Sequence, residues 1–407
     1  IRDSSRNYAS GIKVQMPLGG SVDMTDIYMR NLTTDDGGNC FHFTTTYSGV
    51  YNLRNVTCHN ASISGTGEIY TGGAGVSGTL NQTTMNLVNT SWYDLNTGQV
   101  GAISLEMANG SRLLVEDSYI GQANALLGGG ASIFLNNTCE ATFRNVTFFD
   151  CTALNGGGLW VQAAINTSIT MMDCNFTQNK ADGLGGGFWA NMVGGALLVA
   201  NSSFSNNVGP VFNSSGAYID FSNTNDGAAL SQIAFYSSQL ENNTAVFKGG
   251  GNISFAPGQV QRINGSFVID NSTLMRLEAT SKLEIDGKFY VSGHLEVVVS
   301  DVTLASSDPI TLASYSSVDG EFASVVFVDE KGGSCQGKAE YLATTMQVTM
   351  QCPEASSVPV GAIVGGVVGG VVFLALIVGA LCWFFLVYRP RQLEEKRVRS
   401  KITSTML

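Results

Sequence analysis

The sequence has little proline, few charged residues and no run typical of a long soluble helix. Proline accounts for 7 of the 407 residues and charged residues for 13%, whereas glycine occurs 48 times. The low proline content excludes a proline-rich disordered stalk. The scarcity of charge excludes long helices of the Ala/Glu/Lys/Leu type. These absences favour an all-β chain with many turns.

Patterns for binding metals or nucleic acids are also missing. The three histidines lie far apart and no two cysteines form a C-x-x-C pair, so we expect no zinc site. The formal net charge is −11, although a cluster of basic residues follows Tyr388. The region before that cluster is therefore strongly acidic, which argues against nucleic acid as a partner. We expect no cofactor.

One long uncharged apolar run occurs near the C-terminus, at residues 360–388. A helix needs roughly 20 apolar residues to cross the hydrocarbon core of a membrane, and this run is longer. The basic residues after it predict a cytoplasmic C-terminus. We therefore expect a single-pass type I protein of the plasma membrane, with an extracellular region, a linker at 353–359, a transmembrane helix at 360–388 and a cytoplasmic tail at 389–407.

Three glycines spaced by four share one face of this expected helix. Small residues on one face let two helices approach closely, so we expect a homodimer contact at Gly361, Gly365 and Gly369. A generic glycine-rich anchor is the alternative. No signal peptide is visible after Ile1, and we expect either a removed leader or a missing N-terminal segment.

The extracellular location expected for seven of the cysteines favours disulfide bonds. Proximity in the sequence predicts the pairs Cys40–Cys58 and Cys335–Cys352. Seven is an odd number, so one cysteine stays free or pairs outside this sequence. Three cysteines compete for one further bond: Cys139, Cys151 and Cys174.

Acceptor sequons for N-glycosylation are frequent, and none lies between residue 271 and the C-terminus. In a eukaryotic source several of them would carry glycans, which mark outward-facing turns. The candidates are Asn31, Asn55, Asn60, Asn81, Asn89, Asn109, Asn136, Asn145, Asn166, Asn175, Asn201, Asn213, Asn242, Asn252, Asn264 and Asn271.

A period of 28 residues runs through the middle of the chain. Large apolar residues, which we call the anchors, recur at this step, and the last continues the series after a step of 36. Two apolar residues, seven and five positions before each anchor, have the spacing of side chains on one face of a strand. The anchors are Trp92, Ile120, Phe148, Phe176, Phe204 and Leu240.

Glycine clusters follow most anchors by eight or nine residues, for example at 128–130 and 156–158. Glycine permits close approach of backbones at a corner. Short strands, such corners and no helical period predict that each repeat is one coil of a right-handed parallel β-helix, with coils about 4.8 Å apart. A β-propeller blade would need a longer repeat and a Trp-Asp signature, which the sequence lacks.

Stacked coils also predict a ladder of asparagine side chains. Asn179, Asn207 and Asn243 each follow an anchor by three residues. Asparagine tolerates the left-handed backbone conformation of a corner, so we expect these side chains to stack there.

The anchor and ladder residues resemble a known repeat. Phe176-Thr-Gln-Asn179 and Phe204-Ser-Asn-Asn207 match the F-x-x-N motif of the polymorphic outer-membrane proteins of chlamydiae. Residues 194–197 match their G-G-A-[ILV] motif. The resemblance covers roughly residues 52–255 and implies a right-handed β-helix surface protein, of a type that also occurs in protists and algae. The chain departs from that family at its C-terminus, where we expect a single membrane helix.

The parallel β-helix also hosts pectate lyases and polygalacturonases, in which clustered carboxylates or a Ca²⁺ site and a base carry the reaction. Their motif segments are missing here. Asp35-Asp36 is the only Asp-Asp pair, and Gly293-His294 is not followed by a second glycine. The aspartates of the repeat, Asp117, Asp150 and Asp173, include two at a turn position that asparagine fills equally well.

These observations predict a β-helix ectodomain at 1–270, then irregular last coils and a β cap at 271–352. The function that we expect is adhesion or ligand binding by a glycosylated, disulfide-bonded surface protein without catalytic or metal sites. A membrane-tethered polysaccharide lyase or glycoside hydrolase is one alternative, and a passive structural surface coat is another. The sequence does not say whether the ligand is a carbohydrate or a protein.

Overall fold

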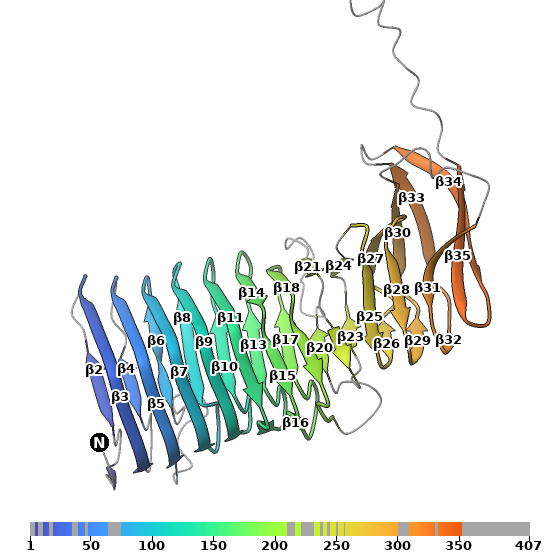
Figure 1. Cartoon of the computed structure of the whole chain (residues 1–407). Helices are drawn as coiled ribbons and strands as arrows, with labels where there is room; N and C mark the ends of the chain where they lie inside the picture. Colours follow the sequence, from blue (N-terminus) through green and yellow to red (C-terminus); the bar gives the residue numbers. More distant parts are fainter. Residues whose placement is uncertain are drawn as a thin grey trace, which may run out of the picture. The chain divides into compact units, whose positions relative to one another are not determined.

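The fold is an all-β parallel solenoid, as the repeat predicts. The computed structural model describes residues 5–6, 11–15, 19–34, 40–44, 48–63, 75–209, 216–220, 232–236, 239–241, 245–249, 251–255, 257–299, 309–329 and 333–351. Within these residues the strands pair in parallel with the equivalent strand of the next coil, and the coils follow one another in sequence order (Figure 1).

Two sheets run along the solenoid. The smaller, with 12 strands among the described residues, contains one strand from each coil. Its strands are β2 (Ile12–Gln15), β4 (Phe41–Thr44), β6 (Val76–Asn81), β8 (Ile103–Ala108), β10 (Ala131–Leu135), β13 (Leu159–Ala163), β17 (Phe188–Met192), β20 (Ala217–Asp220), β23 (Ala245–Lys248), β26 (Phe267–Ile269), β29 (Lys288–Val291) and β32 (Ser317–Asp319).

The larger sheet has 23 strands in the described part of the chain. They are β1 (Ser5–Arg6), β3 (Ser21–Thr34), β5 (Val50–Ile63), β7 (Thr84–Asn96), β9 (Arg112–Asn124), β11 (Glu140–Phe149), β12 (Thr152–Ala153), β14 (Ser168–Met172), β15 (Asn175–Thr177), β16 (Lys180–Ala181), β18 (Ala196–Ala200), β19 (Ser203–Ser205), β21 (Gln232–Tyr236), β22 (Gln239–Glu241), β24 (Asn252–Phe255), β25 (Val260–Asn264), β27 (Leu274–Glu278), β28 (Lys282–Ile285), β30 (His294–Val299), β31 (Ile310–Ser314), β33 (Ser324–Asp329), β34 (Ser334–Tyr341) and β35 (Thr345–Gln351).

The anchors form one inward column of the core. The register pairs Trp92 with Ile120, Ile120 with Phe148, Phe148 with Phe176, Phe176 with Phe204 and Phe204 with Leu240. The first five side chains are buried, and the rings of Phe148, Phe176 and Phe204 stack nearly parallel at centroid distances of 4.6 and 4.7 Å. Such offset stacking adds to the free energy gained from burial alone.

The glycine corners are places where neighbouring coils touch. A Cβ on Gly130 would lie 2.5 Å from the carbonyl oxygen of Gly158, and one on Gly158 would lie 2.6 Å from that of Gly187. A side chain has no room there, so the repeat requires glycine at these positions.

The coils become shorter after residue 232, although the solenoid continues. Gln232 pairs with Asn252 and Leu274 with His294, a step of 20 residues in each case (232 to 252, 274 to 294). Parallel pairing extends to β33, well beyond residue 270. The 28-residue period therefore fades from the sequence because the coil changes length, and only the antiparallel strands β34 and β35 form a cap. A cap pairs backbone groups that the last coil would otherwise expose.

The chain divides into two compact units, residues 1–352 and 353–407. The second unit contains the expected linker, transmembrane helix, glycine contact and tail, and it lies outside the described residues. Within the described part of the chain, no helix is long and apolar enough to cross a membrane.

Candidate binding surface

The expected asparagine ladder lies inside the solenoid. The Nδ2 of Asn179 donates to the carbonyl oxygen of Phe148 at 2.9 Å and to Oδ1 of Asn207 at 3.0 Å. The Nδ2 of Asn207 donates to the carbonyl oxygen of Phe176 at 2.9 Å. Both side chains are buried, so they satisfy backbone groups at a corner and face no ligand. Asn243 lies outside the described residues.

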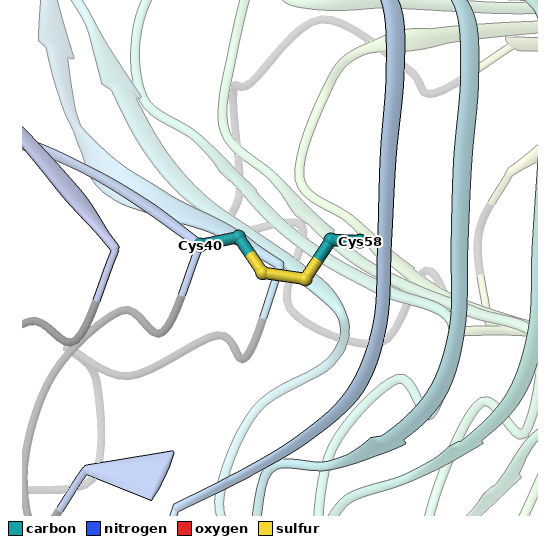
Figure 2. Close-up of a disulfide and its surroundings, with 2 residues drawn as sticks. All are labelled: Cys40 and Cys58. Carbon is teal, nitrogen blue, oxygen red and sulfur yellow. A yellow bond between two sulfur atoms is a disulfide. The ribbon is translucent and has the colours of Figure 1, made fainter. Parts of the chain in front are cut away.

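The predicted disulfide between Cys40 and Cys58 is confirmed (Figure 2). Their Cα atoms are 6.4 Å apart, and Cys58 occupies the anchor column one coil before Trp92. Cys335, in β34, is also disulfide-bonded, and Cys352 lies outside the described residues.

The prediction of a bond among the remaining three cysteines is wrong. All three are free and buried: Cys139, Cys151 and Cys174. The Sγ of Cys151 lies 3.7 Å from the carbonyl oxygen of Ile120, and that of Cys174 lies 3.4 Å from the carbonyl oxygen of Phe143. Burial raises the pKa of both thiols to about 12, so they act as small core residues and not as nucleophiles.

Two columns of residues with left-handed backbone conformation run along the larger sheet. We call them the corner columns. The first contains Asp26, Asn55, Asn89, Asp117, Asn145, Asp173 and Asn201, and the second contains Asn31, Asn60, Asp94, Gln122, Asp150, Gln178 and Asn206; all have φ between +48° and +58°.

Side-chain hydrogen bonds connect neighbours within the corner columns. Asn55 donates to Asp26 at 2.9 Å and Asn89 to Asn55 at 2.6 Å. Asn145 donates to Asp117 at 2.7 Å, and in the second column Asn60 donates to Asn31 at 2.7 Å. The left-handed conformation explains why Asn and Asp occupy these sites, since a short polar side chain tolerates it.

The corner columns also explain many of the sequons. Asn55, Asn89, Asn145 and Asn201 belong to the first column, and the Ser or Thr two residues later points outward from the strand. The repeat therefore generates N-x-[ST] for structural reasons, whether or not a glycan is attached. Among the other candidates, the exposed ones are Asn31, Asn60, Asn109, Asn136, Asn166, Asn175 and Asn271, and Asn81 and Asn252 are partly buried. Asn213, Asn242 and the side chain of Asn264 lie outside the described part.

Between the two corner columns each coil contributes four residues, and together these segments form a narrow face that we call the ribbon. It consists of residues 27–30, 56–59, 90–93, 118–121, 146–149, 174–177 and 202–205. The third position of each segment points inward and includes the anchors, whereas the second and fourth positions point outward.

The outward positions of the ribbon carry a strip of five aromatic side chains, which we call the aromatic strip. It consists of Tyr28, His59, Tyr93, Tyr119 and Phe149. Successive ring centroids are 5.5, 5.1, 6.5 and 6.5 Å apart. Tyr28 is 49% exposed, and its hydroxyl lies 2.7 Å from Nε2 of His59. The strip is therefore a continuous aromatic surface that faces solvent across five coils.

A glycine makes this continuity possible. Gly121 occupies the outward position between Tyr93 and Phe149 in the register. A Cβ there would lie 2.5 Å from the Tyr119 hydroxyl oxygen. The Tyr119 ring thus lies over Gly121 and fills the gap between its two aromatic neighbours.

Aspartates border the aromatic strip and act on its hydroxyl groups. Burial, followed by Tyr28 and Asp94, raises the pKa of Tyr93 above its usual value. Burial, followed by Cys151, Asp150 and Asp94, raises the pKa of Tyr119. The negative field of the second corner column therefore reaches the middle of the strip.

A second surface lies on the smaller sheet. Trp160 and Trp189 stack there at 5.1 Å, and Phe134 packs against Trp160 at 4.7 Å. Farther along, a groove of about 540 Å³ is lined by residues that include Lys248, Asp270 and Tyr290. Trp160 is only 6% exposed, so this row contributes mainly to packing.

The residues considered for catalysis are not brought together. Asp117 and Asp173 lie in the first corner column and Asp150 in the second, and His294 contacts Ser324 Oγ at 2.8 Å. Asp35 and Asp36 lie outside the described residues. No group of three or more His, Cys, Asp or Glu side chains able to hold a metal ion occurs among the described residues.

The comparisons with known proteins add no relative. No protein-family model, curated protein or solved structure matches this chain. The parallel solenoid itself is shown, whereas its assignment to the polymorphic outer-membrane repeats has no support beyond that fold.

Proposed function

We propose that this protein is a non-catalytic binding protein of the cell surface, with the aromatic strip as its ligand-contacting surface. The observation that carries the proposal is the exposed run of five rings across neighbouring coils, from Tyr28 to Phe149. Exposed apolar patches of this kind mark interaction sites on soluble surfaces.

The composition of the ribbon supports binding. Its outward positions combine Tyr, His and Phe with Ser, Thr and Asn, and in the later coils Asn175 Oδ1 accepts from Thr177 at 2.6 Å and from Ser203 at 2.9 Å. Tyrosine supplies rigid contact area at low entropic cost, and small polar residues supply adaptable hydrogen bonds. The hydrogen-bonded corner columns hold this surface in place, which reduces the entropic cost of binding.

The remaining features of the proposal come from the sequence. The apolar run at 360–388 and the basic residues after it favour a type I plasma-membrane protein whose solenoid lies outside the cell and carries N-glycans. Many copies on one surface would multiply modest affinities, and Gly361, Gly365 and Gly369 would bring copies together. The resemblance to surface β-helix repeats agrees with this setting.

The test is an adhesion assay with cells that display the full chain. Cells with the unchanged protein should bind to other cells or to extracellular matrix, and the pair of substitutions Tyr93→Ala and Tyr119→Ala should abolish most of that binding. Tyr290→Ala, on the smaller sheet, is the matched control and should leave it unchanged. Equal adhesion by all three proteins, at equal surface display, would place the ligand elsewhere.

A second candidate is a polysaccharide-active enzyme, and the groove lined by Lys248, Asp270 and Tyr290 is the observation that favours it. Purified protein would be incubated with polygalacturonate and other uronic-acid polymers, with and without Ca²⁺, across acidic to alkaline pH. Release of unsaturated or reducing ends above a heat-denatured control would overturn the non-catalytic proposal.

A further inference from the structure

The ribbon and its corner columns carry an excess of negative charge. Together they contain five aspartates, Asp26, Asp94, Asp117, Asp150 and Asp173, and one basic residue, Arg30. The aspartates lie beside the rings in the sequence, since Asp94 follows Tyr93, Asp150 follows Phe149 and Asp117 precedes Tyr119 by two residues. Each ring in the centre of the strip therefore has a carboxylate close to it.

The nearest cations do not cancel this charge. Arg144, which precedes the first corner column, is paired with Glu116 at 2.9 Å. Lys180, which follows the second, is paired with Asp182 at 3.2 Å. The aromatic strip thus offers ring faces and edges within an acidic frame.

Building on the proposed function, we infer that the aromatic strip binds an extended protein segment in which every second residue is arginine. Guanidinium groups stack on aromatic rings, are weakly hydrated and accept carboxylate partners in a bidentate geometry. An ammonium group is more strongly hydrated and lacks the planar fork, so lysine fits this surface less well.

The spacing of the rings supports an extended partner. Alternate side chains on one face of a strand recur every ~6.8 Å, and the centroids of Tyr93, Tyr119 and Phe149 are 6.5 Å apart at each step. Three consecutive arginines of such a segment therefore meet three consecutive rings, with Asp94, Asp117 and Asp150 beside them.

Labelled synthetic peptides test this inference with the full-length protein. The probe is an Arg-Thr repeat of four units, and the controls are the same composition with the four arginines clustered, a Lys-Thr repeat and a Glu-Thr repeat. The alternating arginine peptide should bind about tenfold more tightly than the clustered and lysine peptides, and its affinity should fall with salt. The glutamate peptide should not bind.

Variants locate the site. Tyr119→Ala, and Asp94→Asn combined with Asp150→Asn, should each weaken the alternating arginine peptide about tenfold, whereas Tyr119→Phe retains the ring and should bind normally. Tyr290→Ala should have no effect. Equal binding of all peptides, or unchanged binding by the strip variants, overturns the inference.

The same assay separates this inference from the proposed function. If cells adhere through the aromatic strip but the arginine peptide neither binds nor competes, the inference fails and the proposed function stands. Binding of a neutral polysaccharide in place of the peptide would identify the strip as a carbohydrate site and would also overturn the inference. If strip variants change neither adhesion nor peptide binding, both fail.

Discussion

The side-chain amide of Asn145 donates a hydrogen bond of 2.7 Å to the carboxylate of Asp117, one coil away in the first corner column. The residue on its other side in that column is Asp173. No two aspartates are neighbours in either corner column: Asp117, Asn145, Asp173 and Asn201 alternate in one, and Asp94, Gln122, Asp150 and Gln178 alternate in the other. Backbone conformation accepts either residue, but stacked carboxylates repel, so the alternation has an electrostatic cause.

The substitution Asn145→Asp should therefore destabilise the solenoid. It replaces a donor by a third consecutive carboxylate, and each neighbour costs about 1 kcal/mol at low salt. The denaturation midpoint should fall more at pH 8, where all three groups are ionised, than at pH 3. Asn145→Ala loses the same hydrogen bond without adding charge and should show no such pH dependence. An equal loss for both variants at both pH values would contradict the electrostatic explanation.

Truncation of an anchor should cost much more than truncation of an outward aromatic residue. Phe176→Ala leaves a cavity between two stacked rings and should lower the free energy of unfolding by about 3–5 kcal/mol. Phe149→Ala removes an outward ring from the strip and should cost about 1 kcal/mol or less. Urea denaturation of the two variants measures the difference, and similar losses would mean that Phe176 is not a core residue.

The buried ladder should be sensitive to loss of its amides. Asn179→Leu leaves the carbonyl oxygen of Phe148 and the backbone amide of Cys151 without their partner. We expect a loss of about 3 kcal/mol, because a buried polar group left unsatisfied costs about 1–3 kcal/mol. Asn175→Ala, on the ribbon, is the control and should be nearly neutral. Chemical denaturation that showed no excess loss for Asn179→Leu would argue against the ladder as a stabilising element.

The free thiols should be silent in the folded protein. At pH 8, Cys151 and Cys174 should not react with a disulfide reagent until the protein is unfolded, because both are buried and the pKa of each is raised to about 12. Unfolded thiols titrate near 8.5. The stability that they contribute is complete below that pH and falls as the pH rises from about 9 to 12, since only the unfolded state loses protons there. The double variant Cys151→Ala, Cys174→Ala should show a smaller fall, and an unchanged pH profile would contradict this assignment.

The membrane topology can be tested on intact cells. An epitope inserted at the exposed turn of residues 136–138 should be removed by external protease, and an epitope after Leu407 should survive until the cells are permeabilised. The opposite pattern of protection would refute the type I orientation.

The inward half of the repeat was accessible from sequence because its signals are periodic. Anchors such as Phe148 and Phe176 recur at a fixed step, and the glycine corners recur with them. The aromatic strip was missed because its members alternate between two outward positions: Tyr119 occupies the second position of its segment and reaches the line of His59 and Tyr93 only because Gly121 leaves space. A sequence period does not show that a side chain leans across to a neighbouring column.

The cysteines and the C-terminal coils show a second limit. Cys151 and Cys174 are 23 residues apart in number, close to one coil, yet they occupy different inward columns and their thiols contact backbone carbonyls in place of each other. After residue 232 the coil becomes shorter, so a search at a step of 28 finds no repeat although parallel pairing continues. Column identity and coil length are properties of the stacked backbone and are not visible in residue spacing alone.

The 28-residue register has an evolutionary consequence. Residue 112 pairs with 140, 140 with 168 and 168 with 196, so a tandem duplication or deletion of any 28-residue segment in this region rejoins every inward column, every corner column and every glycine contact. Recombination can therefore lengthen or shorten the protein by whole coils while leaving both of its ends, and the residues that each end presents, unaltered.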